Sequence, residues 1–397
     1  MMLQAKITEL SQQYFSEIVA IRRHIHAHPE LSFQEKETAA FVSSKLNGWG
    51  ISHKTGIGGF GILGVIQGEK GAGKTVALRA DMDALPITEE NDLPYRSVNV
   101  GAMHACGHDI HTACLLGAAK ILNELKSHWS GKIVLVFQPG EEKIPCGAKL
   151  MLEDGVFSEH TPDLIIGQHV YPELPAGHVG FRPGQYMASS DEIYITLKGK
   201  GGHAALPHKT IDTVLMAAQT VVSLQQVVSR IVPAQVPAVL SFGNIVCNSA
   251  MNIIPETVRL EGTFRTMDEQ WRYVAHDKIR KLAHSVAEGM EGNAEVDIQI
   301  GFPSVYNSPG VTEKAIKAAT ELLGKTQVHA LDIRMTAEDF GWFAQKYPAC
   351  FYRLGVAEKN GEAAAGLHSP KFIANEKAIE TGMQVMACLA VDALNKV

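Results

Sequence analysis

The sequence has 397 residues, of which 46% are hydrophobic and 20% charged, and its formal net charge is −6. This length and composition predict a globular protein of two domains. The sequence contains no block of lysine and arginine residues that would indicate nucleic acid or an anionic membrane as a partner. No apolar run reaches the roughly 18 residues that span a bilayer, and the N-terminus does not resemble a signal peptide. We therefore expect a cytoplasmic protein without nucleic-acid or membrane partners.

The first part of the chain predicts strands that alternate with helices. Apolar, β-branched runs at 75–83, 132–138 and 163–168 are expected strands, and a helix with one buried face is expected over 109–127. Strands and helices in alternation imply a largely parallel sheet. Each of these strands ends in polar residues, and ligands bind at the carboxyl ends of such strands.

The pattern changes from residue 191. Strands and helices are expected in the order β-α-β-β-α-β, which is a ferredoxin-like unit. The expected elements are a strand at 191–197, a helix at 210–230, strands at 237–246 and 256–266, a helix at 268–289 and a strand at 294–300. We therefore interpret 185–303 as an inserted domain, and 1–184 with 304–397 as one discontinuous domain that resumes with a helix at 311–324, strands at 327–334 and 349–355, and a helix at 375–394.

A candidate metal-binding motif occupies residues 103–111, Met-His-Ala-Cys-Gly-His-Asp-Ile-His. Cys106 precedes His108 by two residues, and Gly107 between them allows a tight turn, so that a thiolate and an imidazole can reach one cation. The other cysteines have no paired spacing, which does not indicate a disulfide framework. The motif alone is weak, because a cysteine and a histidine at this spacing also occur by chance.

Further donors complete the inventory of a dinuclear site: Cys106, His108, Glu142, His169 and His368. Adjacent side chains diverge on a turn, so one carboxylate of the Glu141–Glu142 pair could bind metal while the other acts as a general base toward a water molecule that a metal ion has acidified. The alternative for this acidic pair is a solvated position at a helix start, where the helix dipole favours carboxylates.

Three other acidic residues lie near these motifs. Asp81 and Asp83 could bind metal, but we favour a role in which a carboxylate orients a metal-binding imidazole by a hydrogen bond. Asp109, directly after His108, has a similar claim. For His104 and His111 three alternatives remain: they could support a metal ligand through a hydrogen bond, they could contact the substrate, or they could do neither.

The inserted domain carries three candidate residues for substrate. His203 follows two glycines, on a turn that could present its ring outward, although it could equally be an ordinary loop histidine. Asn252 and Arg265 could offer an amide and a guanidinium to a substrate carboxylate, which suits the geometry of arginine. Either could instead be a surface or turn residue.

Taken together, these motifs resemble the dinuclear metallo-amidohydrolases related to carboxypeptidases and aminoacylases. The similarity is to the branch of hippurate hydrolases, N-acyl-L-amino-acid amidohydrolases and auxin-conjugate hydrolases, and it covers nearly the whole chain. It rests on motifs at 26–32, 79–86, 103–109, 138–142, 201–204, 252–255, 262–265, 337–340 and 367–368. The resemblance implies a three-layer α/β catalytic domain, like that of zinc peptidases, with an inserted ferredoxin-like lid or dimerisation domain.

The resemblance also implies roles for individual residues. Cys106 would bridge two metal ions, Glu142 and His368 would complete one site, and His108 and His169 the other. Glu141 would be the catalytic base. His203 would reach the active site of a partner in a homodimer formed through the inserted domain. Lys143-Ile144-Pro145-Cys146 departs from the glycines usual in the family, which puts the local loop and the acyl preference in doubt.

The implied activity is hydrolysis of the amide bond of a small N-acyl amino acid by a metal-activated water. The cofactors would be two divalent ions, zinc or manganese, with cobalt or nickel also possible. A dipeptidase or carboxypeptidase on the same scaffold is the first alternative. A cysteine hydrolase with Cys106 as nucleophile is another, and a binding protein with purely structural metals is a third.

Overall fold

A computed structural model describes residues 2–358 and 365–394. It divides into two compact units: unit 1 comprises 1–185, 306–333 and 342–397, and unit 2 comprises 186–305 and 334–341. The short segment Arg334–Gly341 belongs to unit 2, whereas the sequence placed it in the discontinuous domain. Backbone hydrogen bonds explain this, because Arg334 N donates to Tyr186 O and Ala188 N donates to Arg334 O.

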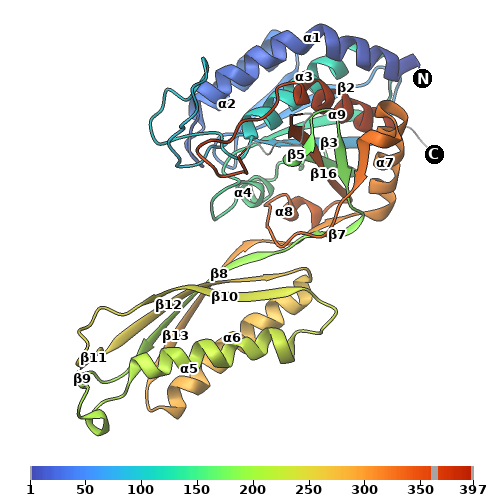
Figure 1. Ribbon diagram of the computed structural model, residues 1–397. Coiled ribbons are helices and arrows are strands. Elements are labelled where there is room, and N and C mark those ends of the chain that lie inside the picture. Colours follow the sequence, from blue (N-terminus) through green and yellow to red (C-terminus); the bar gives the residue numbers. More distant parts are fainter. Residues whose placement is uncertain (1, 359–364, 395–397) are drawn as a thin grey trace. The chain divides into compact units, whose positions relative to one another are not determined.

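Unit 1 is built on an eight-stranded mixed sheet (Figure 1). Its strands, in spatial order, are β1 (Ser52–Ile57), β2 (Gly61–Gln67), β4 (Lys132–Gln138), β3 (Thr75–Asp81), β5 (Leu164–Pro175), β16 (Ala349–Ala357), β6 (Val179–Phe181) and β15 (Val328–Ala330). The four central strands β4, β3, β5 and β16 run parallel. As expected from the sequence, β3 and β4 end in polar residues at one edge of one sheet, whereas β5 continues beyond the expected end at residue 168, so that His169 lies within it.

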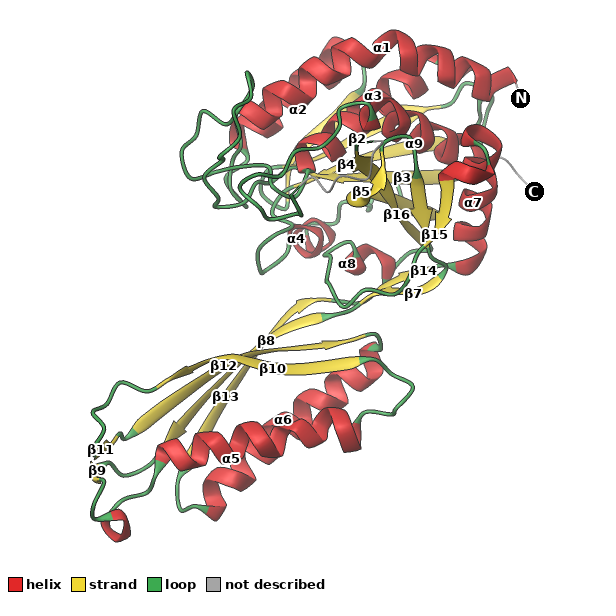
Figure 2. Cartoon of the chain, viewed as in Figure 1, coloured by secondary structure: helices red, strands yellow, loops and turns green. Residues whose placement is uncertain are grey.

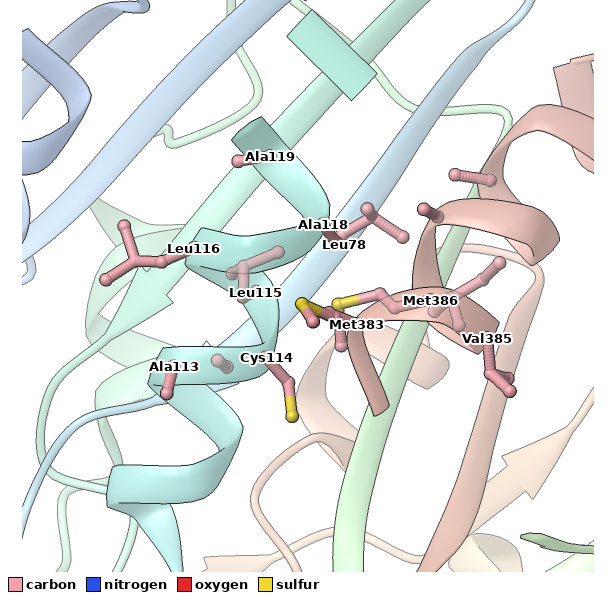
Figure 3. Close-up of a cluster of buried hydrophobic side chains, with 14 of the residues drawn as sticks. Leu78, Ala113, Cys114, Leu115, Leu116, Ala118, Ala119, Met383, Val385 and Met386 are labelled. Atoms are coloured by element: carbon pink, nitrogen blue, oxygen red, sulfur yellow. The ribbon is translucent and has the colours of Figure 1, made fainter. Parts of the chain in front are cut away.

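Helices cover this sheet (Figure 2). The long helices α1 (Met2–Ala27), α3 (His108–Glu124) and α9 (Ala378–Leu394) pack against one another, and α7 (Pro309–Leu323) packs against α9. Shorter helices are α2 (Lys36–Gly48), α4 (Gly147–Glu153) and α8 (Gly341–Ala344). Side chains that alternate along the central strands, such as Leu78 of β3, join α3 and α9 in one buried core (Figure 3).

Unit 2 has a four-stranded antiparallel sheet in the order β10 (Ala238–Val246), β12 (Thr257–Thr266), β8 (Ser190–Lys198) and β13 (Asn293–Phe302). Two helices, α5 (Thr213–Gln226) and α6 (Glu269–Gly289), pack together beside it and share its separate core. The chain order β8-α5-β10-β12-α6-β13 is the ferredoxin-like order expected from the sequence.

Two predicted elements are much shorter than expected, while others differ by a few residues at their ends. The helix expected at 210–230 is α-helical only over Thr213–Gln226, and a π-helical turn, Val227–Ile231, follows. The strand expected at 327–334 is limited to β15, Val328–Ala330, because the chain then departs to bond with Tyr186 through Arg334.

Candidate metal centre

The candidate site lies where the central strands of unit 1 end. Strand β3 ends at Asp81, β4 ends just before the loop that carries Glu141 and Glu142, and α3 begins at His108. Gly107, which caps α3, has a φ of +82°, and a Cβ added to it would lie 2.5 Å from Val170 Cγ2 on β5. A glycine is therefore required for the turn between Cys106 and His108 to lie against β5.

Two groups of possible metal ligands share Cys106. The first contains Cys106, His108 and His169, and the second contains Cys106, Glu142 and His368; within each group the donor atoms lie within 4.8 Å of one another. Cys106 Sγ lies 3.4 Å from His169 Nε2, and Glu142 Oε1 lies 3.3 Å from His368 Nε2. These are the five residues that the sequence proposed as ligands, and the two groups have the sulfur of Cys106 in common.

Two donor atoms in this cluster are buried without a hydrogen-bond partner among the described residues. They are His108 Nε2 and Glu142 Oε1, which lie 3.8 Å apart. Burying polar atoms without a partner is costly, and an imidazole nitrogen and a carboxylate oxygen are both donors to a divalent cation. The residues present therefore fit a metal ion in this place.

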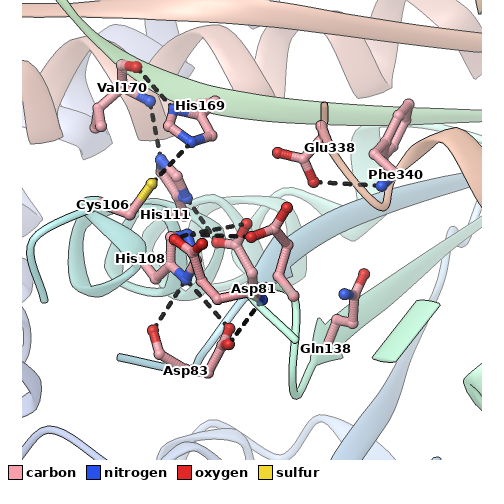
Figure 4. Close-up of polar contacts among 12 residues, drawn as sticks. Asp81, Asp83, Cys106, His108, His111, Gln138, His169, Val170, Glu338 and Phe340 are labelled. Atoms are coloured by element: carbon pink, nitrogen blue, oxygen red, sulfur yellow. Dashed lines mark hydrogen bonds and ion pairs between the residues drawn. The ribbon is translucent and has the colours of Figure 1, made fainter. Parts of the chain in front are cut away.

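Hydrogen bonds orient both buried imidazoles toward the cluster (Figure 4). His108 Nδ1 lies 2.9 Å from the backbone oxygen of Asp83 and 3.2 Å from its Oδ1, while His169 Nδ1 lies 2.8 Å from the backbone oxygen of Val170. Each ring thus donates through Nδ1, so that Nε2 faces the shared cysteine. Such partners fix the tautomer of a metal-binding histidine.

Asp83 also ties the acidic loop to this arrangement. Its Oδ2 accepts hydrogen bonds from the Ser32 hydroxyl, at 2.6 Å, and from Glu142 N, at 3.0 Å. The same carboxylate therefore holds one imidazole and the backbone of a carboxylate ligand. This is the orienting role that the sequence favoured for Asp83.

The protonation of the metal-free cluster follows from its burial and charge. Burial lowers the pKa of His108, but the carboxylates of Asp81 and Asp83 outweigh it and raise the pKa to about 10. Burial, together with Glu142 and Glu141, raises the pKa of the Cys106 thiol well above its usual value. A cation here must displace protons from both groups, so its binding is expected to release protons.

Asp81 and Asp109 make different contacts. Asp81 lies 2.7 Å from Arg79 Nη1 and 2.6 Å from His111 Nδ1, all fully buried. Asp109 bonds to Arg22 Nε at 2.7 Å and to His26 Nδ1 at 2.8 Å, and neither partner is in the candidate ligand set. One step along a helix turns a side chain by about 100°, so Asp109 contacts His26, which is not a candidate ligand, whereas the sequence suggested that it orients a metal-binding imidazole.

Glu141 lies beside the ligands and is almost fully buried. Its Oε2 is 4.0 Å from His108 Nε2, close to the 3.8 Å that separates this nitrogen from Glu142 Oε1. Both carboxylates of the pair therefore face the same imidazole. A carboxylate in this place is within reach of a water molecule at the cluster.

Unit 2 holds the three other predicted residues. His203 is exposed on β9 (Gly202–His203), pairs with Ile253 of β11 (Ile253–Ile254), and so lies next to Asn252. Arg265 is half-buried near the end of β12, where its Nη1 donates to Met335 O at 3.0 Å. Strand β12 starts three residues after Ile254, so about 27 Å of strand separates Arg265 from the His203 end of the unit. One copy of unit 2 therefore does not bring Arg265 to the other two residues.

Sequence reasoning missed Arg79 as a part of the site. It is fully buried, and it bonds to Asp81 and, through Nε, to Gln138 Oε1 at 2.9 Å. The alternation of Arg79 and Asp81 along one strand face was a usable signal, because a buried arginine needs a carboxylate partner. His111, which had been left open, contacts Asp81 and the backbone of β5.

None of the helices in the described part of the chain combines the length and the apolar character needed to cross a membrane.

Comparisons with known proteins identify the family. The family model "Peptidase family M20/M25/M40" matches residues 77–392. YhaA of Bacillus subtilis (strain 168), assigned as an amidohydrolase, is 41% identical over 389 residues, which cover 98% of each chain. The N-acyl-L-amino acid amidohydrolase of Geobacillus stearothermophilus is 40% identical over 306 residues, 77% of this chain and 82% of that protein.

A solved structure agrees in fold. The crystal structure of the Bacillus subtilis YXEP protein, described as a dinuclear metal-binding peptidase, aligns with a TM-score of 0.82 at 33% identity, and the alignment covers 97% of this chain and 100% of that chain. The sequence-based expectation of a three-layer zinc-peptidase-like fold with an inserted domain is thereby confirmed. The chain belongs to peptidase family M20/M25/M40 and is a hydrolase of that family.

Proposed function

We propose that this protein hydrolyses the amide bond of N-acyl amino acids with the help of two divalent metal ions. Cys106, His108 and His169 would hold one ion, and Cys106, Glu142 and His368 the other. The observation that carries the proposal is the pair of buried donor atoms that make no hydrogen bond among the described residues, His108 Nε2 and Glu142 Oε1, beside a second carboxylate that this ligand set does not use. The mixed sulfur, nitrogen and oxygen donors suit zinc or manganese, with cobalt or nickel also compatible.

The chain's own residues divide the chemical work. When bound, the ions would polarise the amide carbonyl and lower the pKa of a water molecule. Glu141 accepts a proton from the water molecule while the water oxygen attacks the carbonyl carbon. The protonated side chain of Glu141 later delivers this proton to the leaving amine nitrogen as the C–N bond breaks. Asp83 keeps His108 and the backbone of Glu142 in place during both steps. The products are a carboxylic acid and a free amino acid.

The function is tested by metal analysis combined with a substrate panel. We expect two equivalents of metal per chain, release of free amino acid from N-acetyl, N-benzoyl or related N-acyl amino acids, loss of that activity on chelation, and its return with added metal. Dipeptides and C-terminal peptide substrates belong in the same panel, because the runner-up is a dipeptidase or carboxypeptidase. Turnover that persists without metal would contradict the proposal and favour a cysteine hydrolase.

We further propose that unit 2 forms a homodimer. Apolar side chains are exposed on α5, at Val214, Leu215 and Val222, and on the edge strand β10, at Val239 and Ile245. Valines and leucines seven or eight residues apart lie on one helix face, and an edge strand with exposed apolar side chains is itself a ready pairing surface. A dimer would also offer His203 of one subunit to the site of the other, as the family resemblance implies.

His203→Ala is expected to lower kcat by about 10²- to 10³-fold, the cost of removing one donor to a developing oxyanion. Co-expression with Glu141→Gln provides the sharp test. If His203 serves the partner, the mixed dimer contains one site with both Glu141 and His203, and activity is partly restored from two inactive variants. Mixed dimers that stay inactive would show that His203 does not act across the subunits.

A further inference from the structure

His111 joins two segments beneath the candidate metal centre. It lies in the first turn of α3 and is fully buried. Its Nδ1 is 2.6 Å from Asp81 Oδ1, at the end of β3, and its Nε2 is 2.9 Å from the backbone nitrogen of Val170 on β5 (Figure 4). Both ring nitrogens are thus engaged.

The partners of His111 define its tautomer. The backbone N–H of Val170 can only donate, so Nε2 must be the unprotonated acceptor. Nδ1 therefore carries the proton and donates it to Asp81, whose carboxylate is held in turn by Arg79. Asp81, His108 and His111 could also be considered as a metal-binding group, but an imidazole with both nitrogens engaged has no lone pair to offer.

Val170 needs such an acceptor because β3 ends early. Strand β3 pairs with β5 only as far as Arg79 opposite Gly167 and ends at Asp81, which this register places opposite His169, so no β3 residue pairs with Val170. An unpaired buried backbone N–H costs free energy. His111 Nε2 takes the place of the missing strand partner.

The same residue of β5 controls a candidate ligand. The backbone oxygen of Val170 accepts from His169 Nδ1 at 2.8 Å, which leaves His169 Nε2 unprotonated, and this Nε2 lies 3.4 Å from Cys106 Sγ. The N–H and the carbonyl of Val170 therefore connect His111 to the orientation of His169.

We propose that His111 is a positioning residue: it fixes the backbone of Val170, and through it the ring of His169, in the orientation that binds a metal ion. The proposal rests on the metal centre described under the proposed function. It assigns no contact with substrate to His111, and it places Arg79 and Asp81 as the anchor that holds the His111 ring.

Two variants separate positioning from simple packing. In His111→Asn the amide reaches about as far as Nδ1, so it can still donate to Asp81 but is too short to accept from Val170. In His111→Gln the amide reaches about as far as Nε2 and can accept from Val170. The full-length metal-free proteins are titrated with Co²⁺ against a chromophoric chelator, which gives two dissociation constants, and thermal unfolding checks that both variants are folded.

We expect His111→Asn to raise one of the two Co²⁺ dissociation constants by about 10- to 100-fold, as loss of an outer hydrogen-bond partner does, and to leave the other unchanged. His111→Gln should restore most of that affinity. Unchanged constants in His111→Asn, or equal weakening in both variants, would overturn the inference. Wild-type protein that binds fewer than two Co²⁺ would overturn the proposed function itself, and the inference with it.

A measurement on the wild-type protein needs no variant to fold. Long-range ¹H–¹⁵N spectra of histidine-labelled, metal-free protein report which nitrogen of each ring carries the proton. The His111 signal is expected to show a protonated Nδ1 and an unprotonated Nε2. A protonated Nε2 could not accept from Val170 and would refute the proposal.

Discussion

Replacing Glu141 by glutamine is expected to lower the rate of amide hydrolysis by about 10²- to 10⁴-fold, the usual contribution of a general acid or base. Glutamine keeps the shape of the side chain but cannot accept the water proton. Glu141 belongs to neither ligand group that contains Cys106. Metal content should therefore stay at the wild-type level, and the loss should appear in kcat.

The neighbouring residue gives the matched control. Glu142→Gln makes the same chemical change one position along the chain, but at the carboxylate that lies 3.3 Å from His368 Nε2. It should lose metal affinity together with activity. Metal analysis and kcat measured on both variants separate the base from the ligand. A Glu141→Gln enzyme with wild-type turnover would remove Glu141 from the mechanism.

Much of this site could be predicted because the sheet is largely parallel. Polar residues at the ends of apolar, β-branched runs in a parallel sheet are expected to meet at one edge of the sheet. The sequence therefore predicts that the donors Glu142 and His169, which follow different expected strands, lie close together. In the structure β3 and β4 end at this edge, while His169 reaches the site from within β5, which continues to Pro175. Chemistry then limited their roles, since a thiol, imidazoles and carboxylates in one place suit a divalent ion.

What could not be predicted depended on exact side-chain direction. Asp81 and Asp109 both flank the motif in sequence, yet Asp81 bonds to Arg79 and His111 whereas Asp109 bonds to Arg22 and His26. These contacts depend on the residue at which β3 ends and on the direction of each side chain in the first turn of α3. The periodicity of the sequence does not predict either of these to within one residue. The role of His111 depends likewise on the length of β3, because a longer strand would have paired with Val170.

The segment 334–341 shows a second limit. Its local pattern gave no reason to separate it from the flanking parts of unit 1, and its place in unit 2 depends on contacts with residues distant in sequence. Arg334 bonds to Tyr186, and Met335 accepts from Arg265. Such non-local pairings are not encoded in the pattern of a short segment.

Replacing Cys106 by alanine is expected to have the second large effect, a loss of affinity for both metal ions. Cys106 is the one residue shared by the two candidate ligand groups, so its removal takes a donor from each. The loss should exceed the roughly 10- to 100-fold cost of losing an outer hydrogen-bond partner. Co²⁺ titration of the metal-free protein measures it, together with the disappearance of the thiolate-to-Co²⁺ charge-transfer band.

Cys106→Asp and Cys247→Ser complete the test. An aspartate offers a carboxylate whose two oxygens can bind two metal ions, so Cys106→Asp should recover metal binding and part of the activity. Cys247 is exposed and outside both ligand groups, and Cys247→Ser should behave as wild type. A cysteine hydrolase would respond differently: Cys106→Asp would be inactive with its metal content intact, and iodoacetamide would inactivate the wild-type enzyme even after chelation.

The Cys106 thiol also gives a prediction on proton release. Burial, together with Glu142 and Glu141, strongly raises the pKa of the metal-free thiol. Metal binding by the wild type should therefore release more protons than metal binding by Cys106→Ala, and calorimetry in two buffers measures this difference.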